Sequence, residues 1–149
     1  MKTQIQIKEY VQKVLENRTF AVLATESQHQ PYTSFIAITV INDLSELVFA
    51  TYRNTKKYTN LINNEKVSIL YEYRNDNVNN KQEITILTAY GIANEVNETD
   101  SNALRKAHIQ QHPEMNDFFQ SADCAIFRVQ VEKYQLVLGI EDIYWWNIN

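Results

Sequence analysis

The segment Ala50-Thr51-Tyr52-Arg53-Asn54-Thr55-Lys56-Lys57-Tyr58-Thr59-Asn60-Leu61 links a predicted strand to a predicted helix. The apolar run Leu47-Val48-Phe49 comes just before it and indicates the strand. Tyr58, Leu61 and Ile62 have the i, i+3, i+4 spacing of a short helix that faces a core. Hydroxyl and ammonium side chains therefore gather at a helix N-terminus, where unpaired N–H groups and the helix dipole favour an anion.

The anion that these side chains suit best is a phosphate. Hydroxyl donors and ammonium groups bind a phosphate more readily than a carboxylate. The candidate ligands are Thr51, Thr55, Lys56 and Lys57. The alternative is a surface turn with solvated lysines. Other parts of the sequence are needed to choose between a phosphate site and such a turn.

The composition limits the class of protein. A chain of 149 residues forms most simply one domain, residues 1–149, which can bury a core without disulfides or a structural metal. Its net charge of −4 argues against a nucleic-acid partner, and its 2 glycines leave no glycine-rich phosphate loop. One cysteine and the lack of an apolar N-terminal or membrane-length run predict a soluble, cytoplasmic protein with no membrane contact.

Short apolar runs separated by polar turns predict strands that pair mostly with their sequence neighbours. We expect a mainly β, α+β fold: a small antiparallel barrel of six to seven strands with two to three flanking helices. Gly91 is a candidate bulge or close-approach point. The predicted strands are 20–25, 32–41, 47–51, 67–73, 84–96, 124–138 and 140–146, and the main helices are 4–16, a short one near 58–62, and 100–111.

The order and spacing of several motifs resemble the pyridoxamine 5′-phosphate oxidase-like family, the FMN-binding split barrels. The resemblance covers nearly the whole chain, although no single motif is specific. The motifs are Phe20-Ala21-Val22-Leu23-Ala24-Thr25, Pro31-Tyr32-Thr33-Ser34, Phe49-Ala50-Thr51 with Thr55-Lys56-Lys57, Tyr90-Gly91, His112-Pro113-Glu114 and Ala125-Ile126-Phe127-Arg128-Val129.

The resemblance implies a homodimer with FMN in a groove between the subunits. By position, Thr51, Thr55, Lys56 and Lys57 look like the phosphate-binding group. The strand that holds Thr33, Ser34 and Phe35 looks like the one beside the isoalloxazine ring, which it contacts largely through its backbone. Either Trp145 or Trp146 would reach the flavin of the other subunit.

The chain also departs from the true pyridoxamine phosphate oxidases. They carry a basic residue early in the second strand, where this chain has Tyr32-Thr33-Ser34. They also have a longer C-terminal segment with an arginine and a histidine, whereas this sequence ends Trp146-Asn147-Ile148-Asn149. We therefore expect a generic flavin-binding relative and not an oxidase of vitamin B6.

Two functional hypotheses follow from the resemblance. The first is an FMN-dependent oxidoreductase with a small-molecule substrate, whose catalytic residues the sequence leaves unknown because the flavin itself carries the redox chemistry. The second is a non-catalytic flavin carrier or sensor, or a relative that has lost its cofactor. A deazaflavin is a third option, but its acidic tail would require a basic track that this acidic chain lacks.

The remaining polar residues predict no further site. His108 and His112 have the four-residue spacing of two metal ligands on a helix, but no third ligand accompanies them, so we expect a surface pair and no metal. Some split barrels bind haem through a histidine in an added C-terminal region, and no histidine follows His112. Cys124 is expected to be a small buried side chain, and the Asn-rich segment 75–80 a solvated turn.

Overall fold

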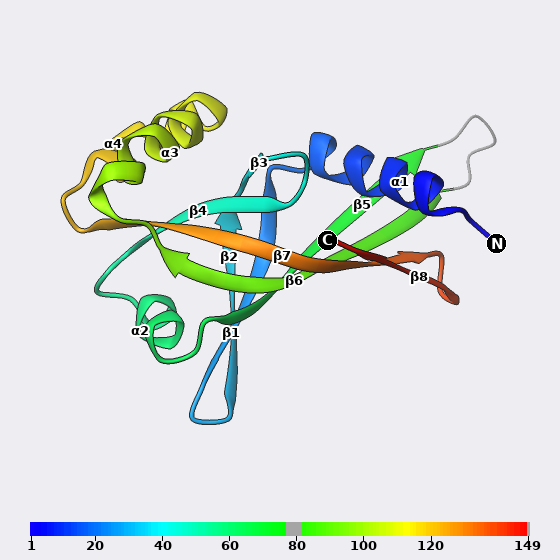
Figure 1. Ribbon diagram of the computed structural model, residues 1–149, viewed down its shortest axis with the longest axis horizontal. Helices are drawn as coiled ribbons and strands as arrows, with labels where there is room; N and C mark the ends of the chain where they lie inside the picture. The colour runs from blue at the N-terminus through cyan, green and yellow to red at the C-terminus, as the bar shows by residue number, and fades with distance from the viewer. Residues whose placement is uncertain (77–81, 149) are drawn as a thin grey trace.

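Helix α1 (Gln4–Asn17), predicted over residues 4–16, begins at a capping box on Thr3. The computed structural model describes residues 1–76 and 82–148 and shows α1 lying along one end of a curled sheet (Figure 1). Ile7, Val11 and Val14 lie on one face of the helix and are buried against that sheet. No helix in these two ranges is long and apolar enough to cross a membrane.

Eight strands lie within the described residues, one more than the upper limit of the prediction. The order of hydrogen-bonded neighbours is β2-β1-β5-β6-β7-β4-β3, every pair is antiparallel, and β8 pairs with β7 outside this path. The strands are β1 (Phe20–Ser27), β2 (Gln30–Ala37), β3 (Thr39–Ile41), β4 (Glu46–Tyr52), β5 (Lys66–Asp76), β6 (Gln82–Glu95), β7 (Cys124–Leu138) and β8 (Asp142–Asn147). The other helices are α2 (Lys56–Asn63), α3 (Glu98–Gln111), the 3-10 turn η1 (Pro113–Met115) and α4 (Asn116–Gln120).

The extra strand arises because the predicted strand 32–41 changes partner partway along. Its first part, β2, pairs with β1, and its last part, β3, pairs with β4 at the opposite end of the sheet. Only Ile38 separates the two parts, so the sheet curls until its two ends meet there. The predicted class, an α+β antiparallel split barrel, is confirmed.

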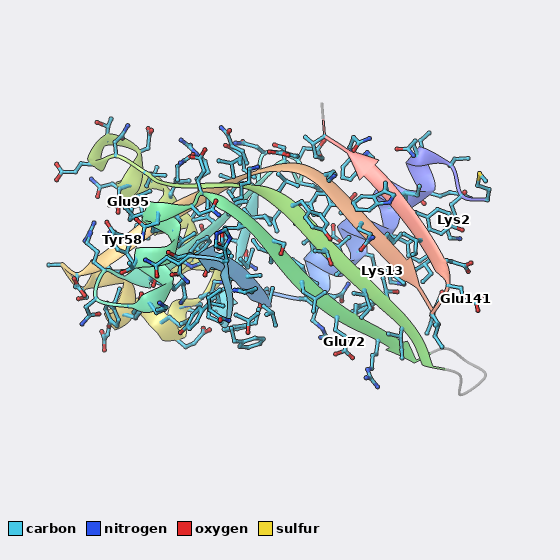
Figure 2. All side chains as sticks on the ribbon, turned by 90° about the horizontal axis from the view of Figure 1, so that it is seen from below. Lys2, Lys13, Tyr58, Glu72, Glu95 and Glu141 are labelled. Carbon is cyan, nitrogen blue, oxygen red and sulfur yellow. The ribbon has the colours of Figure 1, made fainter. Side chains whose placement is uncertain are left out.

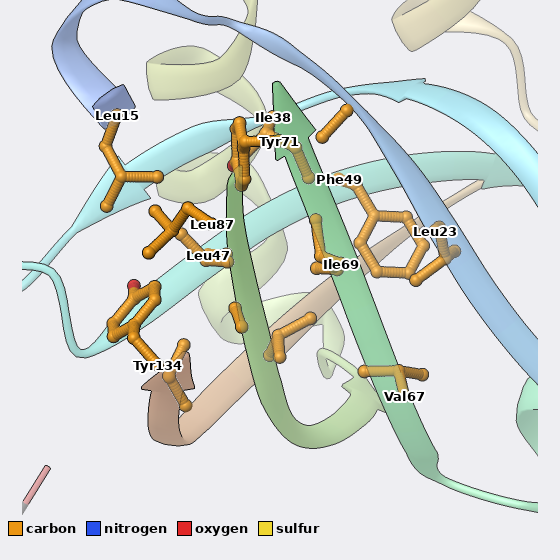
Figure 3. Close-up of a cluster of buried hydrophobic side chains, with 14 of the residues drawn as sticks. Leu15, Leu23, Ile38, Leu47, Phe49, Val67, Ile69, Tyr71, Leu87 and Tyr134 are labelled. Carbon is orange, nitrogen blue, oxygen red and sulfur yellow. The ribbon is translucent and has the colours of Figure 1, made fainter. Parts of the chain in front are cut away.

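The core fills the inside of this curled sheet (Figure 3). Leu23 of β1, Leu47 and Phe49 of β4, Ile69 of β5 and Leu87 of β6 are fully buried there. A second, smaller apolar cluster lies under α3 and α4 on the outer side of β4. The predicted Asn-rich turn falls mostly on residues 77–81, outside the described residues, and β5 and β6 extend farther toward it than expected.

Gly91 lies at a bulge, as its position in the sequence predicts. The β6–β7 register shifts between Tyr90 and Gly91, so that Glu132 is the extra residue on β7. A Cβ at Gly91 would approach the backbone oxygen of Gln130 to 2.3 Å, a distance that the two chains cannot accommodate. Only glycine, which has no Cβ, therefore fits at this position, because the neighbouring strand approaches so closely.

The expectation that His108 and His112 form a surface pair is wrong. Both side chains are buried, with ring centroids 5.0 Å apart. His108 Nδ1 lies 2.6 Å from Thr39 Oγ1, and His112 Nε2 donates a hydrogen bond to the carbonyl oxygen of Ile38 at 2.9 Å. The prediction failed because β3, which covers this side of α3, comes from a distant part of the sequence.

Burial disfavours the charged form of His108, and the neighbouring His112 adds repulsion. Together they lower the pKa of His108 from 6.5 to about 3. The Nε2 atom of His108 is buried, and no described group forms a hydrogen bond with it. In the unfolded chain the same imidazole takes up a proton near its ordinary pKa.

We therefore expect the protein to lose stability as the pH falls below about 6.5, because the unfolded state then binds the proton that the folded His108 excludes. The free energy of unfolding should fall by about 1.4 kcal/mol per pH unit from this residue alone. Urea unfolding between pH 7.5 and 4.5 measures this slope, which should be shallower for His108→Gln. An imidazole NMR signal from His108 that titrates near 6.5 in the folded protein would contradict this assignment.

Candidate functional site

The sheet leaves two strand edges without a partner at the point where its ends meet. β3 pairs only with Glu46–Val48, so the second half of β4, Phe49–Tyr52, has a strand on just one side. β2 pairs with β1 along one edge, and no described strand pairs with its other edge. We call the gap between the free edge of β2 and Phe49–Tyr52 the split. Apart from the carbonyl of Tyr52, which accepts from threonine hydroxyls, the backbone groups that point into this gap have no partner strand among the described residues and can bind a ligand.

The predicted phosphate-binding segment forms the end of this split. Thr51 is buried near the end of β4, and its Oγ1 lies 3.1 Å from Oγ1 of Thr55. Thr55 is the N-cap of α2: its Oγ1 accepts a hydrogen bond from the backbone N–H of Tyr58 and donates one to the carbonyl of Tyr52. The structure thus brings the two predicted hydroxyls together at the start of a helix.

The two lysines differ, although they are neighbours in the sequence. Lys56 is exposed, whereas Lys57 is half-buried, and this burial lowers the pKa of Lys57. Lys57 takes part in none of the ion pairs among the described residues, so no carboxylate neutralises its ammonium group there. A half-buried ammonium with no acid partner beside a helix N-terminus is the electrostatic setting of an anion site.

The predicted ring-contact residues lie on β2, along the other side of the split. Thr33 is exposed, and Phe35 is 71% exposed. The Oγ atom of Ser34 is buried, and no described group forms a hydrogen bond with it. Continuing the β3–β4 register past Ile38 would set Ile36 opposite Thr51, so Ser34, Phe35 and the threonine pair flank the same gap.

The C-terminal tryptophans lie far from this gap within one chain. Trp145 is opposite Gln135 on β7, whereas Thr51 is opposite Ala125. Ten residues of strand, roughly 33 Å, separate these two positions. Trp146 stacks on Tyr134 at 5.7 Å and packs on the core, and Trp145 points away from it and is 42% exposed. The two rings face opposite sides, as the strand period predicts.

Sequence reasoning missed a polar cluster that flanks the threonine pair. The carboxylate of Glu95, at the end of β6, accepts hydrogen bonds from Tyr58 on α2 and from Arg53 in the turn before it. Arg53 also forms one wall of a cleft of about 610 Å³ between that turn and α3. Glu95 is 42 positions from Arg53. No local pattern could have indicated this contact, because it depends on sheet order.

The described residues contain no group of three or more His, Cys, Asp or Glu side chains placed to hold a metal ion. Cys124 is a free cysteine, and its side chain is buried, as expected. Burial raises the pKa of its thiol. A buried, protonated thiol is a poor nucleophile, so the chemistry of this region does not centre on Cys124.

The chain is similar to a known protein family and to several solved structures. The family model described as pyridoxamine 5′-phosphate oxidase matches residues 7–138. A heme-binding protein from Mycobacterium smegmatis is 16% identical, with a TM-score of 0.82 over 99% of this chain and 59% of that one. A FAD-binding protein from Mesorhizobium loti is 17% identical, with a TM-score of 0.73 over 89% of this chain and 94% of that one.

General Stress Protein 26 from Bacillus anthracis is also similar, with 17% identity and a TM-score of 0.69 over 96% of this chain and 99% of that one. No curated protein matches the sequence. At these identities the solved structures establish a shared fold. The family match spans most of the chain, from α1 to the end of β7. The protein therefore belongs to the pyridoxamine 5′-phosphate oxidase-like family.

Proposed function

We propose that the protein binds FMN in the split and is an FMN-dependent oxidoreductase that acts on a small molecule in the cytoplasm. The observation that carries this proposal is that α2 begins with the Thr51–Thr55 hydroxyl pair and with a half-buried Lys57 that forms no ion pair with a carboxylate of the described residues. These three residues would bind the phosphate group of FMN. The free edge of β2 and the buried Ser34 hydroxyl, which no described group hydrogen-bonds, supply donors and acceptors beside the ring.

The residues present fit FMN on chemical grounds. Hydroxyl and ammonium donors at a helix start match a phosphate monoester. An unpaired strand edge offers alternating N–H and C=O groups, which match the edge of a flavin ring. Bound flavin supplies the hydride or electron transfer, and the protein holds the phosphate, orients the ring and excludes water from the split.

The two lysines should contribute unequally to FMN binding. Lys57→Ala should weaken FMN binding by about tenfold to a hundredfold, because it removes a charge-assisted contact in a partly buried place. Lys56→Ala should change the affinity by less than about threefold, since an exposed charge contributes little. Fluorescence titration of FMN, with FAD and hemin as comparison ligands, measures both effects. Equal affinities for the two variants would remove Lys57 from the phosphate site.

We infer further that two copies pair through the outer face of the sheet. One register row crosses six strands on this face, and several of its side chains are apolar and exposed. Large exposed apolar surfaces of this kind mark interfaces. The row is Phe35, Val22, Leu70, Thr88, Gln135 and Trp145. Trp145 is on this row and Trp146 is not, so Trp145 is the tryptophan that would contact the split of the partner subunit.

A charge in the centre of this row should therefore separate the subunits. Leu70→Glu is expected to sediment as a monomer and to bind FMN more weakly, because the partner's contribution to the split is lost. Ile5→Glu is the matched control: it places the same charge on an exposed apolar residue of α1. Sedimentation velocity measures both. A wild-type monomer, or a dimeric Leu70→Glu, would exclude this face as the interface.

Catalysis and flavin carriage differ in whether a reductant reaches the bound ring. We expect excess NADH or NADPH under anaerobic conditions to bleach the absorbance of bound FMN near 450 nm, roughly the band of oxidised flavin. Free FMN at the same concentration is the control for the uncatalysed reaction. Bound flavin that is reduced no faster than free flavin by either nucleotide would favour the non-catalytic carrier or sensor.

A further inference from the structure

We propose that Glu95 is a positioning residue for the phosphate end of the cofactor, because it fixes the turn that carries the threonine pair and Lys57. This inference rests on the proposed FMN site. Glu95 lies at the last position of β6 and comes from a part of the chain that supplies no predicted ligand. Figure 2 shows Glu95 beside Tyr58 at the end of the sheet.

The carboxylate of Glu95 holds the two flanks of the turn with its two oxygens. Its Oε2 accepts from Arg53 Nη2 at 3.0 Å, and its Oε1 accepts from the hydroxyl of Tyr58 at 2.7 Å. Arg53 precedes Thr55, and Tyr58 follows Lys57. The proposed phosphate ligands of α2 therefore lie between two residues that one carboxylate ties together.

Arg53 is in turn fixed to the start of β7. Its backbone N–H donates to the carbonyl of Asp123 at 3.0 Å, and its Nη1 donates to the carbonyl of Ala122 at 3.1 Å. The Tyr58 ring also packs edge-on against Phe127 of β7 at 5.9 Å. The turn is thus held against β6 and β7, although the side chains of Arg53 and Asn54 are exposed.

This attachment matters because the phosphate ligands come from two elements. Thr51 belongs to β4, whereas Thr55 and Lys57 belong to α2, and the intervening turn sets the distance between them. A ligand that must first order its site loses affinity to the cost of that ordering. A pre-ordered turn removes this cost, in the way that outer partners orient the ligands of a metal site.

The charge of Glu95 allows a second role that predicts the opposite result. Glu95 also neutralises Arg53, and a freed guanidinium could itself attract the phosphate. Glutamine distinguishes the two roles, because its carbonyl can accept from Arg53 while its amide donates to the oxygen of Tyr58. Glu95→Gln therefore keeps the attachment and removes the charge, whereas Glu95→Ala removes both.

The experiment measures the affinities of FMN and riboflavin for the wild-type protein and for both variants. Riboflavin lacks the phosphate, so it reports the ring site without the turn. We expect Glu95→Ala to weaken FMN binding about tenfold, the loss of one charge-assisted hydrogen bond, and to leave riboflavin within about twofold. Glu95→Gln should retain FMN affinity within about threefold of wild type.

Glu46→Ala is the matched control. Glu46 is a partly buried glutamate paired with Arg128 at 3.6 Å, and it lies at the opposite end of β4 from Thr51. Its loss removes an ion pair of the same kind without touching the turn. We expect its FMN affinity to equal that of the wild type.

Three results would overturn the positioning role: tighter FMN binding by both Glu95 variants, equal losses of FMN and riboflavin in Glu95→Ala, or unchanged FMN affinity in Glu95→Ala. The first would assign Glu95 to shielding of Arg53, and the second to general stability. A wild-type protein that binds neither flavin would instead reject the proposed function, and this inference with it.

Discussion

The buried backbone of Ile38 is the constraint on which the rest of the structure depends. At this residue the chain leaves one end of the sheet and joins the other, so no strand neighbour can pair with it. Its N–H donates to the carbonyl of Thr19 at 2.8 Å, and its carbonyl accepts from His112 at 2.9 Å. Buried backbone groups need such partners, and these two hydrogen bonds replace those that a neighbouring strand would otherwise make with Ile38. The split opens immediately beyond it, between β2 and the second half of β4.

This constraint gives the buried histidines a structural role. His112 satisfies a carbonyl that the crossing leaves unpaired, and His108 contacts it from one helical turn earlier and bonds to Thr39. α3 is thereby attached to the crossing residue Ile38 and to Thr39, which follows it. The cost is acid sensitivity, because the imidazole of His108 must remain neutral. The helix that covers the outer side of β4 and the crossing that forms the split are stabilised by the same pair.

The sequence predicts the local features well and the long-range ones poorly. The threonine pair and the start of α2 follow from residues within a single turn of chain, and the structure places them as expected. The break at Ile38 leaves no trace in the apolar pattern of 32–41, because both parts are strands. The lack of a third metal ligand led to the prediction of a surface pair at His108 and His112, whose burial depends on residues of β3 and α4. Glu95 meets Arg53 only through the order β6-β7-β4, which no local pattern encodes.

The bulge at Glu132 divides the longest strand of the sheet into two parts with separate neighbours. β4 pairs with β7 before this residue, and β8 pairs with β7 after it, on the same edge. β6 covers the opposite edge along both parts. β8 thus pairs only with the part of β7 after Glu132, and β4 pairs only with the part before it. A change after β7 would therefore alter the end of the molecule that carries Trp145, and not the strands that form the split of the same chain.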